Sequence, residues 1–250
     1  MDFPKDRHNE PAMQQPGFRE GMLGGHGGGV NGVFITVEGV EGSGKSTQIL
    51  RLSERLRRLG VPLVASKEPG GTALGLELRR LLLTRHSSGE QWCPDAELLL
   101  FYADRAQHLS QLIRPSLEAG KVVLLDRFED STRAYQGALG VPESTLDRLC
   151  DLVVGRTRPH LTILLDMDPE ASLVRVDTRN LDLGDSFKET RYDEEALAFH
   201  RLVRNRFLAI HQREPNRIRV VPARISPDEV ERQIWHQVAP LLRNAGLRVE

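Results

Sequence analysis

The sequence predicts an α/β protein in which a parallel sheet carries helices on both faces. A glycine-rich segment, EGVEGSGKST at 38–47, lies directly behind the apolar run VFIT and directly ahead of a helical pattern. Two further apolar runs end in an acid, KVVLLD at 121–126 and LTILLD at 161–166, as strands buried on both faces commonly do. Strand-like and helix-like segments alternate along the chain, and this alternation is typical of a parallel sheet with crossover helices.

Five segments have the composition of strands. We expect them at Val33–Glu38, Val61–Ser66, Lys121–Asp126, Leu161–Asp166 and Ile218–Val221.

Four segments have the apolar spacing of helices. The first contains Ile49, Leu52, Leu56 and Leu59 and ends at Gly60, and the second covers about 75–84. In the third, Asp95 is the expected N-cap, and the apolar stripe consists of Leu99, Tyr102, Ala106, Leu109 and Ile113. A long fourth helix contains Phe199, Val203, Phe207 and Ile210.

Composition limits the possible classes of protein. The 250 residues include 34 basic and 35 acidic side chains, a balance that argues against a general nucleic-acid coat. No apolar run approaches the roughly 20 residues that cross a bilayer, so we expect no membrane span. The two cysteines form no CxxC motif, so a disulfide framework or structural zinc is not expected, and a cytoplasmic location fits best.

Residues 1–31 are rich in glycine, proline and polar side chains and have no apolar periodicity. We interpret this segment as a disordered tail. Its GGHGGG stretch has one histidine and no second ligand nearby, so a flexible linker is preferred over a metal site. Residues 32–250 have no internal repeat and are expected to form one domain.

The glycine-rich segment matches the pattern G-x-x-x-x-G-K-[ST] between a strand and a helix, the context that this phosphate-binding motif requires. The alternative, a glycine-rich turn with a chance lysine, is disfavoured by those flanking elements. Glycines let backbone N–H groups approach an anion, and the following helix adds the positive end of its dipole. We expect Lys45 to reach the β- and γ-phosphates of ATP, and Ser46 to ligate Mg²⁺. The predicted nucleotide-binding residues are Gly39, Val40, Glu41, Gly42, Ser43, Gly44, Lys45, Ser46 and Thr47.

Asp126 and Arg127 follow the strand that is expected beside this loop. An acid at the tip of a buried strand can hold Mg²⁺, directly or through water, although many buried strands end in aspartate. A cation at the carboxyl end of a strand points into the ligand crevice of such a sheet. The alternative for Arg127 is a surface salt bridge.

The chain has no NKxD guanine-binding motif, and it is short for a motor-type ATPase. Among the classes of phosphate-loop protein, this leaves the small kinases, which bind a second substrate. Phe101 and Arg105 are four residues apart on one helix face, and an aromatic plane beside a guanidinium suits a nucleobase. The alternative is that Phe101 belongs to the core and Arg105 to the solvated surface.

Four blocks resemble the thymidylate kinase family in order and spacing: EGVEGSGKSTQ, EPGGTALGLELR at 68–79, LLLFYADRAQH at 98–108 and DRFEDSTRAYQG at 126–137. The resemblance extends from about Val33 to the C-terminal region. It implies a five-stranded parallel sheet with a mobile lid at about 175–192. It also implies phosphorylation of dTMP to dTDP by Mg²⁺ and ATP, and a homodimer.

The resemblance also implies roles for individual residues. Phe101 should stack on thymine, Arg105 should bond the base edge, and Gln136 should lie near the base. Arg79 and Arg127 should hold the dTMP phosphate, and Thr132 should lie beside the bound nucleotide. Glu41 should contact the sugar 3′-hydroxyl, while Glu68 and Asp126 should lie near the metal and its waters.

The sequence departs from the family pattern at several positions. Family members often have arginine at the position of Gly42, and those with glycine are thought to supply the cation from the lid. Arg175, Arg179 and Arg191 are candidates, although the usual lid pattern is replaced by TRYD at 190–193. Lys67 stands where the family usually has an arginine, and we assign it no role in binding or catalysis. The catalytic set is therefore expected to be Lys45, Asp126, Arg127, Arg179 and Arg191.

Two other functions remain open at this stage. One is a related kinase with a different acceptor, such as dUMP, a deoxynucleoside or another monophosphate. The other is a module that binds ATP without transferring its phosphate.

Overall fold

The computed structural model describes residues 32–84, 86–183, 192 and 195–249. The predicted tail, residues 1–31, lies outside this part of the chain. Five parallel strands form one sheet in the order β2-β3-β1-β4-β5, which confirms the predicted fold class. The strands are β1 (Val33–Glu38), β2 (Leu63–Lys67), β3 (Val122–Asp126), β4 (Leu161–Asp166) and β5 (Ile218–Pro222).

Strand β1 lies at the centre of the sheet, between β3 and β4. Val37 near its end is in register with Asp126, the last residue of β3. From β1 the chain adds β2 and β3 on one side of the sheet and β4 and β5 on the other, so the strand order changes direction beside β1. Sheets of this kind bind ligands in the crevice at such a point, here beyond the carboxyl ends of β1 and β3.

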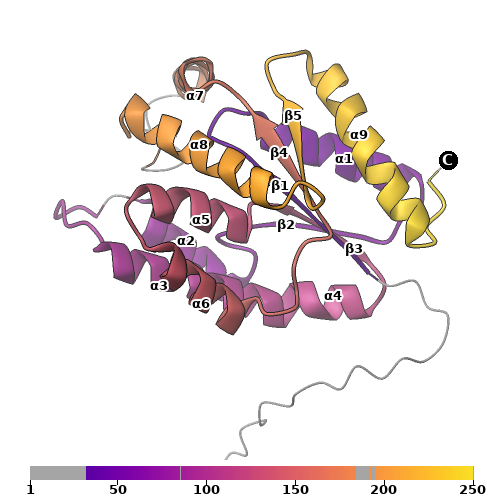
Figure 1. Ribbon diagram of the computed structural model, residues 1–250, viewed down its shortest axis with the longest axis horizontal. Helices are drawn as coiled ribbons and strands as arrows, with labels where there is room; N and C mark the ends of the chain where they lie inside the picture. The colour runs from indigo at the N-terminus through magenta and orange to yellow at the C-terminus, as the bar shows by residue number, and fades with distance from the viewer. Residues whose placement is uncertain (1–31, 85, 184–191, 193–194, 250) are drawn as a thin grey trace, which may run out of the picture.

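The helices cover both faces of the sheet (Figure 1), with α1 and α9 on one side and α3, α4 and α6 on the other. In chain order they are α1 (Lys45–Arg58), α2 (Ala73–Leu83), α3 (Pro94–His108), a π-helical turn (Leu109–Ile113), α4 (Arg114–Glu118), α5 (Glu129–Ala138), α6 (Glu143–Val153), α7 (Pro169–Leu183), α8 (Leu197–Arg213) and α9 (Pro227–Asn244).

Alternate side chains of β1 enter different parts of the core, as the period of a strand requires. Ile35 and Val37 belong to the same apolar cluster as Leu56 of α1, whereas Phe34 belongs to a cluster with Ile113. The phosphate-binding loop is thus attached to a strand that is fully buried on both faces.

Helix α3 differs from the prediction at its start and along its buried face. It begins at Pro94 with Cys93 as N-cap, so Asp95 lies inside the first turn. Leu99 is 57% exposed and Ala106 is also exposed, whereas Leu98 and Arg105 are buried. The predicted stripe was wrong at these positions because α3 buries charged side chains that are paired inside the protein.

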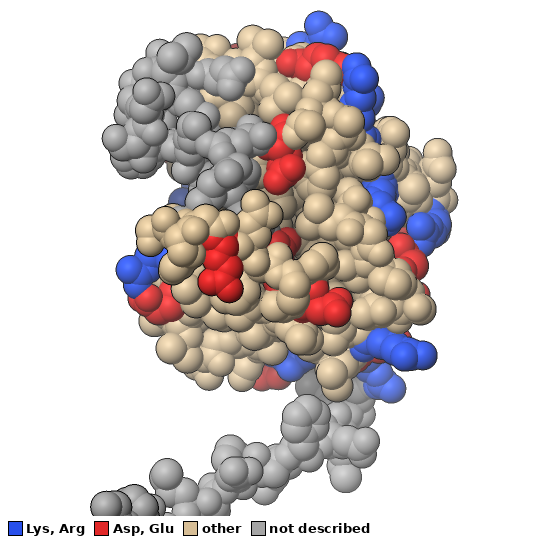
Figure 2. All heavy atoms as spheres, turned by 90° about the vertical axis from the view of Figure 1, so that its left-hand side faces the viewer, with Lys and Arg blue, Asp and Glu red and all other residues tan. Residues whose placement is uncertain are grey.

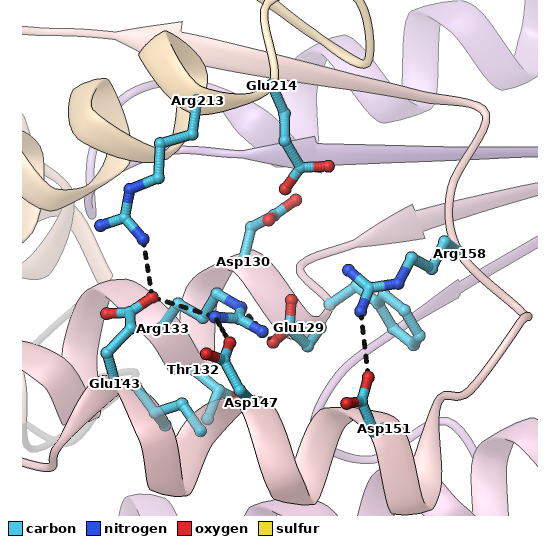
Figure 3. A network of polar contacts seen from close by, with 12 residues as sticks. Glu129, Asp130, Thr132, Arg133, Glu143, Asp147, Asp151, Arg158, Arg213 and Glu214 are labelled. Carbon is cyan, nitrogen blue, oxygen red and sulfur yellow. Dashed lines mark hydrogen bonds and ion pairs between the residues drawn. The ribbon is translucent and has the colours of Figure 1, made fainter.

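An ion-pair network joins α5 to its neighbours (Figure 3). Arg133 of α5 donates to Glu129 at 2.5 Å, to Glu143 at 3.0 Å and to Asp147 at 2.6 Å. Arg213 of α8 also donates to Glu143, at 3.0 Å. These bonds hold α5, which lies beside the crevice, against α6 and α8.

In the view of Figure 2, acidic and basic side chains are interspersed, and neither sign of charge forms one broad surface. Within the described part of the chain, the helices are too short or too polar to cross a bilayer.

Candidate nucleotide and phosphoryl-transfer site

The loop between β1 and α1 is shaped to bind an anion. Gly39 has φ +144°, and a Cβ there would lie 2.6 Å from the carbonyl oxygen of Leu165, so only glycine fits. Gly44 is the N-cap of α1 and provides no side-chain cap, which leaves the N–H groups of the first turn for a ligand. Lys45 folds back over the loop, and its Nζ donates to the carbonyls of Gly39 at 3.1 Å and Val40 at 2.9 Å.

A cavity of about 510 Å³ opens over this loop. Its lining includes Lys45, Ser46, Thr47, Asp126 and Arg127. Burial, and then the nearby Arg127 guanidinium, lower the pKa of Lys45 to about 8. The lysine is therefore still charged at neutral pH, although it is held in a poorly solvated position.

Ser46 and Asp126 meet at the floor of this cavity. The Ser46 hydroxyl donates to Asp126 Oδ2 at 3.3 Å. The other carboxylate oxygen, Oδ1, is buried and has no hydrogen-bond partner among the described residues. An orphaned carboxylate oxygen beside a hydroxyl and a phosphate-binding loop fits Mg²⁺, which takes a few oxygen ligands from the protein and keeps several waters.

A second, smaller cavity of about 70 Å³ lies beside the first. Its lining includes Phe101, Arg105 and Gln136, which were predicted to lie at the base, together with Thr132 and Tyr192. Phe101 is half-buried and packs against the main apolar cluster, yet it also borders this cavity. The structure thus brings residues from α3 and α5 to one opening.

Arg105 is almost fully buried, so the alternative of a solvated arginine was wrong. Its Nε donates to Glu68 at 2.9 Å, and its Nη2 donates to the Phe128 carbonyl at 3.1 Å and to Thr132 Oγ1 at 2.9 Å. Nη1 is buried without a hydrogen-bond partner in the described part of the chain. Because a buried N–H group without an acceptor is costly, Arg105 Nη1 is suited to donate to a carbonyl oxygen of a ligand.

Glu68 follows β2 and lies between two side chains of α3. Its Oε2 accepts from Arg105, and its Oε1 lies 3.0 Å from His108 Nδ1. Both oxygens are therefore engaged by the protein, and the carboxylate is placed to orient Arg105. Sequence reasoning gave no role to His108, although it ends the LLLFYADRAQH block.

Glu41 of the loop forms a cluster with Arg127 and Tyr135. The Tyr135 hydroxyl lies 2.7 and 2.6 Å from its two oxygens, and Arg127 Nη2 donates to Oε1 at 2.9 Å. Burial alone would raise the pKa of Glu41, but the cations Arg127 and Lys45 outweigh it and lower the pKa. The salt bridge of Arg127 is thus made to a buried acid of the phosphate-binding loop and not to a surface acid.

The two cavities share four charged wall residues. Glu41, Glu68, Arg79 and Arg127 line both cavities. Arg79 also donates to the Pro69 carbonyl at 2.9 Å. The boundary between the cavities is therefore the place where two ligands would approach each other.

Gln136 is fixed by a buried polar cluster at the far end of the second cavity. Its Nε2 donates to Glu97 at 2.9 Å and to the Tyr192 hydroxyl at 3.2 Å, and Tyr192 donates to Glu97 at 2.5 Å. Sequence reasoning gave Tyr192 no role, although it lies in the TRYD segment.

Of the predicted lid arginines, Arg175 of α7 lines the first cavity, and its Nη1 donates to the Ala223 carbonyl at 3.3 Å. The side chain of Arg179 and the whole of Arg191 lie outside the described part of the structure.

A phosphate-binding loop that faces a second cavity suited to a nucleobase defines a P-loop kinase acting on a small second substrate. The sequence model described as Thymidylate kinase matches residues 37–234. A thymidylate kinase of Syntrophotalea carbinolica is 47% identical over 85% of this chain and 98% of the relative, and one of Synechococcus sp. is 46% identical over 84% and 96%. A crystal structure of thymidylate kinase from Ehrlichia chaffeensis superposes with a TM-score of 0.66 at 32% identity, over 84% of this chain and 99% of that one. The chain belongs to the thymidylate kinase family.

Proposed function

We propose that the chain transfers the γ-phosphoryl group of ATP to dTMP and forms dTDP. The observation that carries this proposal is the junction of the two cavities, whose shared walls include Glu41, Arg79 and Arg127. A phosphate-binding loop lies on one side of that junction, and Phe101 and Arg105 lie on the other. Membership of the thymidylate kinase family supports dTMP as the acceptor.

ATP would occupy the larger cavity with its phosphates on the loop 39–47. Lys45 Nζ, which donates to the Gly39 and Val40 carbonyls, would transfer its hydrogen bonds to the β- and γ-phosphates. Because Gly42 offers no side chain, a further cation for the γ-phosphate would come from Arg175, Arg179 or Arg191.

dTMP would occupy the smaller cavity with its base between Phe101 and Arg105. Arg105 Nη1 would donate to a carbonyl of the base, and Phe101 would provide the stacking plane. Thr132 and Gln136 line the same space. Arg79 and Arg127 would hold the phosphate at the junction, and Glu41 would face the sugar.

The acceptor needs no strong general base. A phosphate monoester has a second pKa near 6, so dTMP is already mostly a dianionic nucleophile at neutral pH. The barrier arises because two polyanions must approach each other. Lys45, Arg127 and a lid arginine would neutralise charge on the phosphoryl group during in-line transfer. Lys45 and Arg127 are already held in place by hydrogen bonds to the phosphate-binding loop.

Mg²⁺ is the proposed metal, with Ser46 and Asp126 as its protein ligands. When bound, it would neutralise charge on the phosphate oxygens. Asp126 Oδ1, which is buried and has no hydrogen-bond partner among the described residues, supports this assignment.

A panel of acceptors with Mg²⁺ and ATP tests the proposal. We expect dTMP to give the highest kcat/KM, well above dUMP, thymidine and the other nucleoside monophosphates. A different preferred acceptor would favour the related-kinase alternative. ATP binding by calorimetry without transfer to any acceptor would favour a non-catalytic ATP-binding module.

We also propose that the chain forms a homodimer in the cytoplasm. Leu74 and Leu81, seven residues apart on α2, are 64% and 51% exposed, and Leu99 on the adjacent α3 is 57% exposed. Exposed leucines on neighbouring helices support a protein interface there. Both cysteines are free, which supports a reducing compartment. Sedimentation equilibrium of the protein and of Leu81→Arg tests the dimer.

A further inference from the structure

The last residue of β1, Glu38, is a fully buried acid that has no role in the proposed phosphoryl transfer as described by the cavity residues. Its exposed fraction is 0%. Burying a carboxylate is costly unless hydrogen bonds satisfy its oxygens. Both oxygens are satisfied by one short segment: Phe128 N–H donates to Oε1 at 2.7 Å, and the Ser131 hydroxyl donates to Oε2 at 2.6 Å.

The segment held by Glu38 includes an unusual backbone position. Arg127 has φ +67°, and within the described part of the chain no other non-glycine residue has a positive φ. This conformation costs roughly 1–2 kcal/mol for an L-residue. Arg127 N–H donates to the Val37 carbonyl at 3.0 Å, and the next N–H, of Phe128, donates to Glu38. The peptide groups on both sides of Arg127 are therefore anchored to β1.

Glu38 also reaches the guanidinium of Arg127 through one intermediate. Ser131 Oγ accepts from Arg127 Nη1 at 3.0 Å while it donates to Glu38. The other terminal nitrogen, Nη2, donates to Glu41 at 2.9 Å. Because Arg127 lines both cavities, the carboxyl group of Glu38 fixes the backbone and the head group of the cation at their junction.

We propose that Glu38 is a positioning residue for phosphoryl transfer, which holds Arg127 in its left-handed conformation and aims its guanidinium at the junction. This inference rests on the proposed function, because it assigns Arg127 to the transferred phosphate. Glu38 itself touches neither cavity and is not a catalytic residue.

The electrostatics of Glu38 separate this role from a purely structural one. Burial, and then the charge of Asp130, raise the pKa of Glu38 to about 8. The buried carboxyl group is therefore mostly protonated at neutral pH, and each of its two oxygens can still accept a hydrogen bond. A neutral amide at this position has a single accepting oxygen, which would still accept from Phe128 N–H. It would lose the acceptor for the Ser131 hydroxyl. Glu38→Gln should therefore keep the fold and misplace the arginine.

Steady-state kinetics of Glu38→Gln, Ser131→Ala and the double variant test the proposal. We expect Glu38→Gln to lower kcat by about 10- to 100-fold, the scale of a misplaced catalytic group. The KM for ATP should change by less than about threefold, because the loop and Lys45 are untouched. Ser131→Ala should lower kcat less, and the double variant should be no slower than Glu38→Gln, since both act through one chain of bonds.

Asp166→Asn is the matched control, because it also replaces a strand-end acid by an amide, in the neighbouring β4. The Asp166 side chain pairs with Arg204, and neither residue is among those that line the two cavities. Its variant should keep kcat within about twofold. A Glu38→Gln enzyme with wild-type kcat overturns the proposal. So does a loss of kcat that only matches a loss of folded protein measured by circular dichroism, or an additive double variant. Absence of dTMP phosphorylation by the wild type would instead overturn the proposed function, and this inference with it.

Discussion

Replacing Gly42 by alanine tests how the phosphate-binding loop is packed. Gly42 has φ +69°, and a Cβ there would overlap the carbonyl oxygen of Ser172 and lie 3.1 Å from Val176 Cγ2. Ser172, fully buried in α7, also donates its hydroxyl to the Glu41 carbonyl at 2.5 Å. Helix α7 therefore lies directly on the loop at the position where other members of the family have an arginine.

Two effects should destabilise Gly42→Ala. The left-handed conformation costs an alanine roughly 1–2 kcal/mol. Overpacking against the carbonyl of Ser172 should cost a further 1–3 kcal/mol or so. Gly140→Ala is the matched control, because Gly140 has φ +93° and a Cβ there would have no atom within 4 Å. It should carry only the first cost.

Thermal and urea unfolding of the two variants measure the difference. We expect Gly42→Ala to be less stable than Gly140→Ala by about 1–3 kcal/mol, where 1 kcal/mol corresponds to about 2–4 °C in a protein of this size. ATP affinity should fall in Gly42→Ala alone, since only that variant displaces the loop. Equal melting temperatures would refute the packing of α7 on the loop. If the packing holds, α7 leaves no room for a side chain at 42, which supports the proposal that the further cation comes from Arg175, Arg179 or Arg191.

Three further predictions concern single side chains. Lys45→Ala should lower kcat by about 10³-fold or more without loss of fold, since it removes a fixed cation from the transferred phosphate; near-wild-type turnover would contradict the phosphate-loop assignment. Phe101→Ala should weaken dTMP binding by about 1–3 kcal/mol in calorimetry. Phe101→Leu restores most of the side-chain volume without an aromatic plane, so it should recover the melting temperature but not the affinity for dTMP. An unchanged Kd for dTMP in both variants would show that Phe101 serves only the apolar core. Because burial raises the pKa of Glu38 from 4.5 to about 8, the folded protein retains a proton between these values that the unfolded chain releases. As pH rises through this window the wild type should therefore lose stability relative to Glu38→Gln, by at most about 1.4 kcal/mol per pH unit. Urea unfolding between about pH 5 and pH 8 measures this trend, and a pH-independent difference would rule it out.

The sheet and the phosphate-binding loop were predictable because their signals are local. An apolar run that ends in an acid identifies a buried strand without knowledge of its neighbours, and β3 and β4 ended at the predicted acids, Asp126 and Asp166. The glycine spacing, read together with the strand before it and the helix after it, likewise predicts the loop from local sequence alone. The second strand was predicted to begin at Val61, but it begins at Leu63. Val61 and Pro62 have strand-like neighbours in the sequence and belong to the connection before the strand.

Long-range pairs of charged side chains were not predictable. The buried face of α3 includes Arg105 and His108, and it exists because Glu68, which follows β2, lies between them. An apolar-stripe argument assumes that charges face water, so it selected Leu99 in place of Leu98. Glu38 was missed for the same reason, since its partners lie in a segment about ninety residues away in the chain.

The charge of the described lining supports the prediction that a lid arginine contributes to the site. Cationic side chains in the two cavities are Lys45, Lys67, Arg79, Arg105, Arg127 and Arg175, and acidic ones are Glu41, Glu68 and Asp126. The lining thus carries a net charge of about +3, whereas ATP and dTMP together bring about −6. Mg²⁺ and one further arginine would supply the difference. On this count we expect one more cation at the site of a chain with glycine at 42, and the predicted candidates are Arg179 and Arg191.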